Sequence, residues 1–239
     1  MTSRGPAAGV VTLLLAMALA ACDALPGKPD PARQELLPSQ VVSFGALYAN
    51  NCAGCHGADG RLGASRPLND PVYLALVPRE RVRTVIADGI PNTLQPAFAV
   101  TAGGPLTDAQ IDALVAGIAQ TWAKPPAITA GSLPPYAAAA GSADRGQAVY
   151  AAACAGCHGA TGLGGPKGGA IADASYLSLV TDQYLRTTVI AGRVDLGMPD
   201  WRGTLSGQPL TAQQIADVVA WLSAKRRPVP GRPVQASEG

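Results

Sequence analysis

The pattern of apolar and polar positions predicts an all-α chain in which one helical plan occurs twice. Two stretches place apolar residues at the i, i+3, i+4, i+7 spacing of a helix with one buried face. The first is Ile111, Leu114, Val115 and Ile118, and the second is Ile215, Val218, Val219 and Leu222. Each stretch follows a Thr-x-x-Gln pattern, at Thr107 and Thr211, which is typical of a helix N-terminus. The sequence contains no alternating pattern of useful length for a β-strand.

Further elements repeat in the same order, which predicts two similar domains. A short helix is expected before each cysteine pair, and middle helices are expected at about 78–88 and 182–191. Residues 84–87 and 188–191 both have the sequence Thr-Val-Ile-Ala. A Pro-rich stretch at 125–142 separates the copies and is predicted to be a linker. We therefore expect one domain at 43–124 and a second at 143–227.

The N-terminus has the pattern of a targeting segment rather than of a folded element. Arg4 precedes an uncharged run from Ala7 to Ala21, which is shorter than the ~20 residues of a membrane-spanning helix. The run ends in Leu-Ala-Ala-Cys at Cys22, which resembles the bacterial lipoprotein box. That resemblance implies cleavage before Cys22 and lipidation of Cys22. An ordinary secretory signal or an uncleaved anchor are the alternatives.

The segments on either side of the expected domains are predicted to be extended. Residues 22–42 contain four prolines and mixed charges, which favours a tether between an anchor and the first domain. Residues 228–239 are expected to form a disordered tail.

Composition narrows the classes of function. The formal net charge is +2, so the chain lacks the basic footprint of a nucleic-acid binder. Charged residues make up 14% of the chain, and aromatic residues only 5%. These few large side chains would not easily fill two cores, so a bulky apolar group other than protein would complete the packing.

The cysteine and histidine residues indicate what that group is. Every histidine, and every cysteine except Cys22, lies in one of two Cys-Ala-Gly-Cys-His motifs. The motif residues are Cys52, Cys55, His56, Cys154, Cys157 and His158. C-x-x-C-H is typical of c-type haem attachment, with two thioether bonds to the porphyrin and the histidine on iron. A zinc site needs about four ligands where each motif has three, and a thioredoxin-like motif needs a βαβ setting. The motifs thus predict two covalently bound c-type haems.

With these motifs, the chain resembles small class I-like c-type cytochromes in a tandem dihaem form, over about residues 43–225. The resemblance implies a few helices wrapped around each haem, with His56 and His158 as axial ligands. It implies a methionine followed by proline as the sixth ligand some forty residues later, which Met198 matches in the second copy. It also implies that a proline carbonyl holds each histidine ring, with Pro67 and Pro166 as candidates.

The first copy departs from this pattern because it has no methionine. Aligning Gly89 with Gly192 and Pro96 with Pro199 puts Gln95 at the position of Met198. Gln95 is one candidate sixth ligand, and the others are Asn92, Tyr73, a lysine or a group from a partner protein. Gln95 could instead line the loop over a five-coordinate or water-ligated iron.

These features predict a membrane-tethered electron-transfer protein, either a free carrier or a fixed subunit of a redox complex, that faces the periplasm or the cell exterior of a bacterium. The resemblance implies a quinol-oxidising complex or a periplasmic dehydrogenase as donor and a terminal oxidase as acceptor, and the tether favours membrane-bound partners. A catalytic function is not expected. The alternative is an enzyme or a sensor that binds gas or peroxide at an open first haem, which reactivity toward small ligands would reveal.

Overall fold

The structure is a computed structural model, and it describes residues 35–123, 132–137, 139–205 and 207–227. The predicted signal peptide, Cys22, most of the predicted tether and the predicted tail lie outside the described residues. The chain divides into compact units 1–40 and 41–239. The described part of the first unit contains the 3-10 helix η3 (Pro38–Gln40). None of the helices in the described ranges has the length and apolarity needed to cross a membrane.

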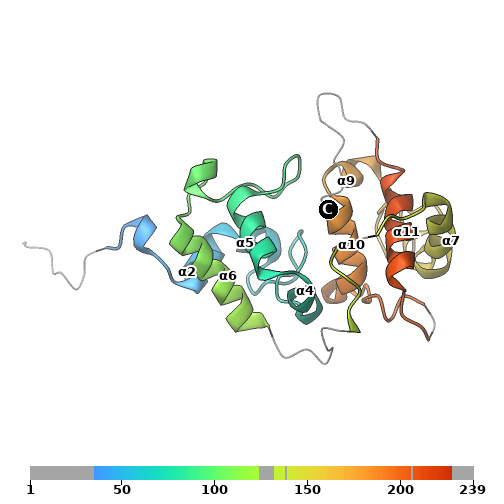
Figure 1. Cartoon of the computed structure of the whole chain (residues 1–239), viewed down its shortest axis with the longest axis horizontal. Helices are drawn as coiled ribbons and strands as arrows, with labels where there is room; N and C mark the ends of the chain where they lie inside the picture. The colour runs from blue at the N-terminus through green and yellow to red at the C-terminus, as the bar shows by residue number, and fades with distance from the viewer. Residues whose placement is uncertain (1–34, 124–131, 138, 206, 228–239) are drawn as a thin grey trace, which may run out of the picture. The chain divides into compact units, whose positions relative to one another are not determined.

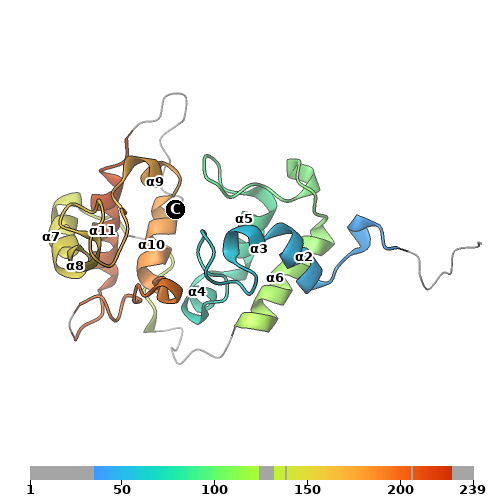
Figure 2. The same ribbon diagram turned by 180° about the vertical axis from the view of Figure 1, so that it is seen from behind.

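The second unit contains both repeats and is helical, as predicted (Figures 1 and 2). The first repeat consists of α2 (Phe44–Asn51), α3 (Ala53–His56), α4 (Pro71–Leu76), α5 (Arg79–Asp88), η4 (Val100–Ala102) and α6 (Asp108–Trp122). The second consists of α7 (Ala143–Ala153), α8 (Ala155–His158), α9 (Ala174–Ser178), α10 (Asp182–Ala191), η6 (Val194–Leu196) and α11 (Ala212–Ser223). Extended pairing within the described residues is limited to isolated bridges. The expected all-α fold is thus confirmed.

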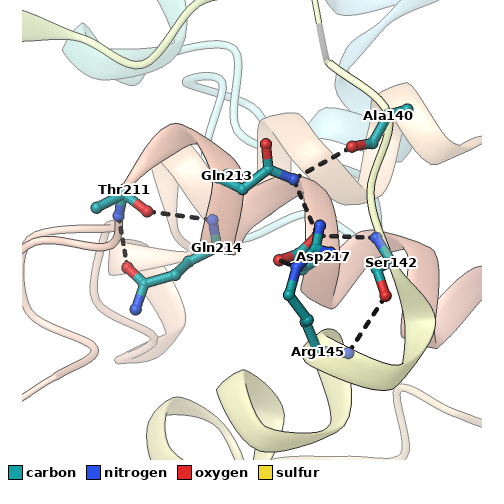
Figure 3. Close-up of polar contacts among 7 residues, drawn as sticks. All are labelled: Ala140, Ser142, Arg145, Thr211, Gln213, Gln214 and Asp217. Carbon is teal, nitrogen blue, oxygen red and sulfur yellow. Dashed lines mark hydrogen bonds and ion pairs between the residues drawn. The ribbon is translucent and has the colours of Figure 1, made fainter.

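The last helix of each repeat begins at the predicted capping box. The Thr107 side chain accepts a hydrogen bond from the Gln110 backbone N–H, and the Gln110 side chain accepts one from the Thr107 N–H. Thr211 and Gln214 do the same at the start of α11 (Figure 3). Each box satisfies two N–H groups that a helix start leaves unpaired, so local sequence fixes where both helices begin.

The first and last helices of each repeat pack together. The large residue of the contact lies on the first helix in one repeat and on the last helix in the other. α2 packs on α6, and α7 packs on α11 (Figures 1 and 2). In the first repeat Phe44 fills the space beside Gly117, where an added Cβ would lie 2.2 Å from the Phe44 ring. In the second repeat the glycine is Gly146 on the first helix, beside Trp221 on the last. At each helix crossing, a large aromatic side chain on one helix therefore packs beside a glycine on the other.

Substituting Gly117 with alanine is expected to lower the free energy of unfolding by about 1–3 kcal/mol, because α2 and α6 must move apart. Gly45→Ala on α2 is the matched control. Nothing lies within 4 Å of its added Cβ, so it is expected to be neutral or stabilising. Denaturant unfolding of both variants measures the difference, and an equal effect of the two substitutions would contradict the packing argument.

A buried carboxylate joins the two helices of the second repeat (Figure 3). Asp217 on α11 is 3% exposed. It accepts hydrogen bonds from the Ser142 N–H at 2.8 Å and from two guanidinium nitrogens of Arg145, each at 2.8 Å. Gln213 donates a further hydrogen bond to it at 3.0 Å. Asp217 thereby holds the start of α7 on α11.

Asp217→Asn is expected to cost about 1–3 kcal/mol of stability at pH 7, because a buried acceptor of several hydrogen bonds loses its charge. The hydrogen bonds from Arg145 lower the pKa of Asp217 to about 2, below its usual value near 4. Its contribution is therefore complete above about pH 4 and is lost as the pH falls from about 4 to 2. Asp112→Asn, in an exposed ion pair with Arg83, is the control and is expected to cost under about 1 kcal/mol.

Candidate haem-binding sites

Both Cys-Ala-Gly-Cys-His motifs fold into the same short helical turn. The His56 N–H donates a hydrogen bond to the Cys52 carbonyl at 3.0 Å, and the His158 N–H donates one to the Cys154 carbonyl at 3.0 Å. In each motif the first cysteine is half-buried and the second is exposed. Each repeat therefore presents two thiols and an imidazole from a single turn.

A backbone carbonyl fixes the ring of each motif histidine. Nδ1 of His56 lies 2.8 Å from the Arg66 carbonyl oxygen, and Nδ1 of His158 lies 2.8 Å from the Gly169 carbonyl oxygen. A proton on Nδ1 donates this hydrogen bond and leaves the Nε2 lone pair for a metal, the usual arrangement of a histidine ligand.

The predicted acceptors Pro67 and Pro166 are therefore corrected. In the first repeat the carbonyl belongs to the residue before Pro67. In the second it belongs to Gly169, in a glycine-rich loop that carries the chain past Pro166 before it meets the ring. The family resemblance implies a carbonyl on each histidine ring, but the path of each loop decides which residue supplies it.

A tyrosine that lies outside each motif fixes the turn that follows it. The Tyr48 hydroxyl donates to the Gly57 carbonyl at 2.8 Å, and the Tyr150 hydroxyl donates to the Gly159 carbonyl at 2.6 Å. Both glycines have positive φ, and a Cβ on Gly57 would lie 1.7 Å from a backbone oxygen. The sequence signal was the glycine that directly follows each histidine.

Burial shifts the pKa values of titratable groups in both motifs. It raises the pKa of the Cys52 and Cys154 thiols to about 11, so both remain protonated at neutral pH. The pKa of His56 is lowered by burial and by the charges of Arg66 and Arg193, which favours the neutral imidazole that binds iron.

Met198 and Gln95 occupy the same position in equivalent loops. The Met198 carbonyl accepts a hydrogen bond from the Arg193 N–H at 3.1 Å, directly after Gly192. The Gln95 carbonyl accepts one from the Ile90 N–H at 3.0 Å, directly after Gly89. The backbone hydrogen bonds thus agree with the repeat alignment, which places Gln95 at the position of Met198.

The Gln95 side chain donates from Nε2 to the neighbouring Pro96 carbonyl at 3.4 Å. Of the other candidates for the first site, Tyr73 on α4 lies under the Arg66 guanidinium, which is 5.3 Å from its ring centroid. Asn92 adopts a positive φ of 61° in the loop before Gln95.

Comparison with known proteins identifies the family of the chain. The model of the family "Cytochrome C oxidase, cbb3-type, subunit III" matches residues 40–116 and 141–222. The chain belongs to this family. A cytochrome c family implies covalently bound c-type haem, which the cysteines and oriented histidines of both motifs fit.

Individual relatives cover parts of the chain. The cbb3-type cytochrome c oxidase subunit FixPc of Rhizobium leguminosarum bv. viciae is 30% identical over 176 residues, 69% of this chain and 55% of its own length. Dihydro-heme d1 dehydrogenase of Pseudomonas aeruginosa is 45% identical over 75 residues, 31% of this chain and 14% of its own length. The chain thus spans little more than half of one relative and a small part of the other.

Among solved structures, a chain of the reducing HAO-like protein complex of Kuenenia stuttgartiensis superposes with a TM-score of 0.46 at 16% identity. The alignment covers 81% of this chain and all of that one.

Proposed function

We propose that this member of the cbb3-type subunit III family is a membrane-tethered dihaem cytochrome c that passes single electrons to a terminal oxidase. The observation that carries the proposal is the duplicated site. Each repeat combines a pair of thiols with a histidine whose Nδ1 lies 2.8 Å from a carbonyl oxygen. The two haem domains are proposed to comprise residues 43–124 and 143–227.

The residues of each site have distinct roles in this proposal. Cys52 and Cys55 hold one haem, and Cys154 and Cys157 hold the other. A bound haem supplies the one-electron exchange between Fe(II) and Fe(III). His56 and His158 supply the fifth ligand, oriented by the carbonyls on Nδ1.

The sixth ligand distinguishes the two sites. Met198 supplies it at the second, and a Met–His pair raises the reduction potential. Gln95 holds that position at the first, so the first site has the lower potential. Electrons then pass downhill from the first site to the second.

The partners are proposed to be membrane-bound, with a quinol-oxidising complex or a dehydrogenase as donor. The name of the relative FixPc, a cytochrome c oxidase subunit, supports an oxidase as acceptor. Stopped-flow mixing of the reduced protein with membranes that contain a cbb3-type oxidase tests this. We expect oxidation of both haems that depends on oxygen and is blocked by cyanide, and no oxidation would contradict the proposed acceptor.

Cys22 is proposed to carry the lipid that anchors the mature chain to the membrane. Cys22→Ser is expected to move the protein from the membrane fraction to the soluble fraction, or to leave its precursor uncleaved, with no change in haem content. Fractionation and intact-mass measurement check this, and an unlipidated, membrane-bound wild-type protein would contradict it.

A second function, ligand binding at the first site, is favoured by the hydrogen bond from Gln95 to Pro96, since it turns the amide toward its own backbone. The dehydrogenase among the relatives also supports chemistry beyond electron transfer. Titration of the reduced protein with carbon monoxide separates the two functions. Binding at the first site alone supports the second function, and no binding at either site favours electron transfer alone.

A further inference from the structure

Within the unit of residues 41–239, the two repeats share a buried interface. Helix α4 of the first repeat packs on α10 of the second. One core cluster combines Val72, Leu76 and Val77 from the first repeat with Val189 and Ile190 from the second. A continuous apolar contact of this kind favours a fixed arrangement over freely moving domains.

Arg66 connects the first haem site to this interface, because its backbone contacts His56 and its side chain contacts the second repeat. Its carbonyl oxygen lies 2.8 Å from Nδ1 of His56. Its guanidinium donates to the Tyr184 carbonyl at 2.8 Å and to the Thr188 hydroxyl at 3.1 Å, both on α10. The guanidinium also lies over the Tyr184 ring, 4.3 Å from its centroid. The second repeat thus holds the residue that orients the His56 imidazole.

Arg193 makes a second connection, between the loop of the first motif and the loop of Met198. Its guanidinium donates to the Gly63 carbonyl at 3.0 Å. Gly63 lies directly against the first motif, since an added Cβ would come within 2.2 Å of the Cys55 carbonyl. The backbone of Arg193 is paired with Met198 in an antiparallel bridge, so one residue contacts the surroundings of both sites.

Asp195 completes this second connection. Its carboxylate forms an ion pair with Arg193 at 3.0 Å and accepts a hydrogen bond from the Leu62 N–H at 3.0 Å. The Asp195 side chain is 3% exposed and that of Arg193 is 13% exposed. A largely buried, charge-assisted contact of this kind fixes the geometry of the loop more firmly than an exposed one.

Building on the proposed function, we infer that Arg66 and Arg193 are positioning residues through which the second repeat sets the reduction potential and axial geometry of the first haem. Ferric haem carries one more positive charge than ferrous haem, so nearby guanidinium groups favour the reduced form and raise the potential. Asp195 offsets part of the Arg193 charge. Arg66 carries its charge at an interface and orients His56 through its backbone, so its side chain has the larger effect on the first site.

The test is a redox titration of full-length, haem-loaded variants with the sites assigned by paramagnetic resonance. Arg66→Gln is expected to shift the Fe(II)/Fe(III) equilibrium of the first site about tenfold toward Fe(III). This corresponds to a reduction potential that is lower by about 59 mV for one electron. The second site should keep its potential. Arg193→Gln is expected to shift both sites. The control is Arg83→Gln, which removes an equal charge from an exposed ion pair with Asp108 and Asp112 and should shift neither.

Arg66→Lys separates positioning from charge and guards against a variant that does not fold. Lysine keeps the charge but cannot reproduce the two directed hydrogen bonds and the ring contact. The potential should stay near that of the parent, while the resonance spectrum of the first haem changes as the His56 ring reorients. An unchanged spectrum in Arg66→Lys, or a shift in Arg66→Gln no larger than that in Arg83→Gln, would overturn the inference. A parent protein without two redox-active haems would instead refute the proposed function.

Discussion

Replacing Met198 with alanine is expected to lower the reduction potential of the second site by on the order of a hundred millivolts and to leave the first site unchanged. Axial ligands set haem potentials over about 0.8 V, and a Met–His pair lies toward the upper end. Loss of the thioether also opens one coordination position, so the variant should bind carbon monoxide at the second site. A redox titration followed by absorption measures the first effect, and ligand titration measures the second.

Two further variants sharpen this experiment. Leu196→Ala is the matched control, because it removes an exposed apolar side chain from the same loop and should leave both potentials unchanged. Gln95→Met introduces the thioether at the equivalent position of the first repeat and should raise the potential of that site. The assignment of the sixth ligand is wrong if Met198→Ala and Leu196→Ala behave alike.

Replacing both cysteines of one motif with serine is expected to remove one covalent haem per chain. The Cys52→Ser/Cys55→Ser and Cys154→Ser/Cys157→Ser variants should each retain one, since thioether bonds attach the group. Mass spectrometry of the denatured chain counts the haems that remain. Each repeat also loses a large apolar part of its core, so the free energy of unfolding should fall as well.

The control for the cysteine variants is Cys22→Ser, which leaves both motifs intact and should keep two haems. An identical haem content in the two double variants and in the parent would contradict covalent attachment at these cysteines. Loss of both haems from either variant alone would show that the sites do not form independently.

Much of the fold follows from short-range patterns in the sequence. The apolar stripe after Thr107 and the one after Thr211 each sit behind a capping box, and both helices begin where these local hydrogen bonds place them. The middle helices at 78–88 and 182–191 agree with α5 and α10 to within one residue. The repeat alignment also predicts that Gln95 takes the position of Met198. The structure agrees, because the carbonyl groups of Gln95 and Met198 accept equivalent backbone hydrogen bonds.

What the sequence could not predict depends on loops and on contacts distant along the chain. The family resemblance implies that a carbonyl holds each histidine ring, but the loop conformation makes Arg66 and Gly169 the acceptors instead of Pro67 and Pro166. The contacts of Arg66 with α10 join residues that are more than a hundred positions apart. A single arginine carries no local signal for such a contact.

The packing at Gly117 and at Trp221 also could not be predicted from the sequence pattern alone. Gly117 and Trp221 stand at equivalent positions of the two repeats, but the sequence does not show what packs beside each of them. Only the structure places Phe44 over Gly117 and Gly146 beside Trp221, because each partner lies on the opposite end of its repeat.

The central claim is that one chain carries two covalent haems of unequal potential, and an anaerobic reductive titration of the intact protein tests it most directly. We expect the intact protein to take up two electrons per chain in two separate one-electron waves. In Met198→Ala, the wave of higher potential should move to a lower potential. One electron per chain would contradict the claim, as would two electrons in waves that Met198→Ala leaves unchanged.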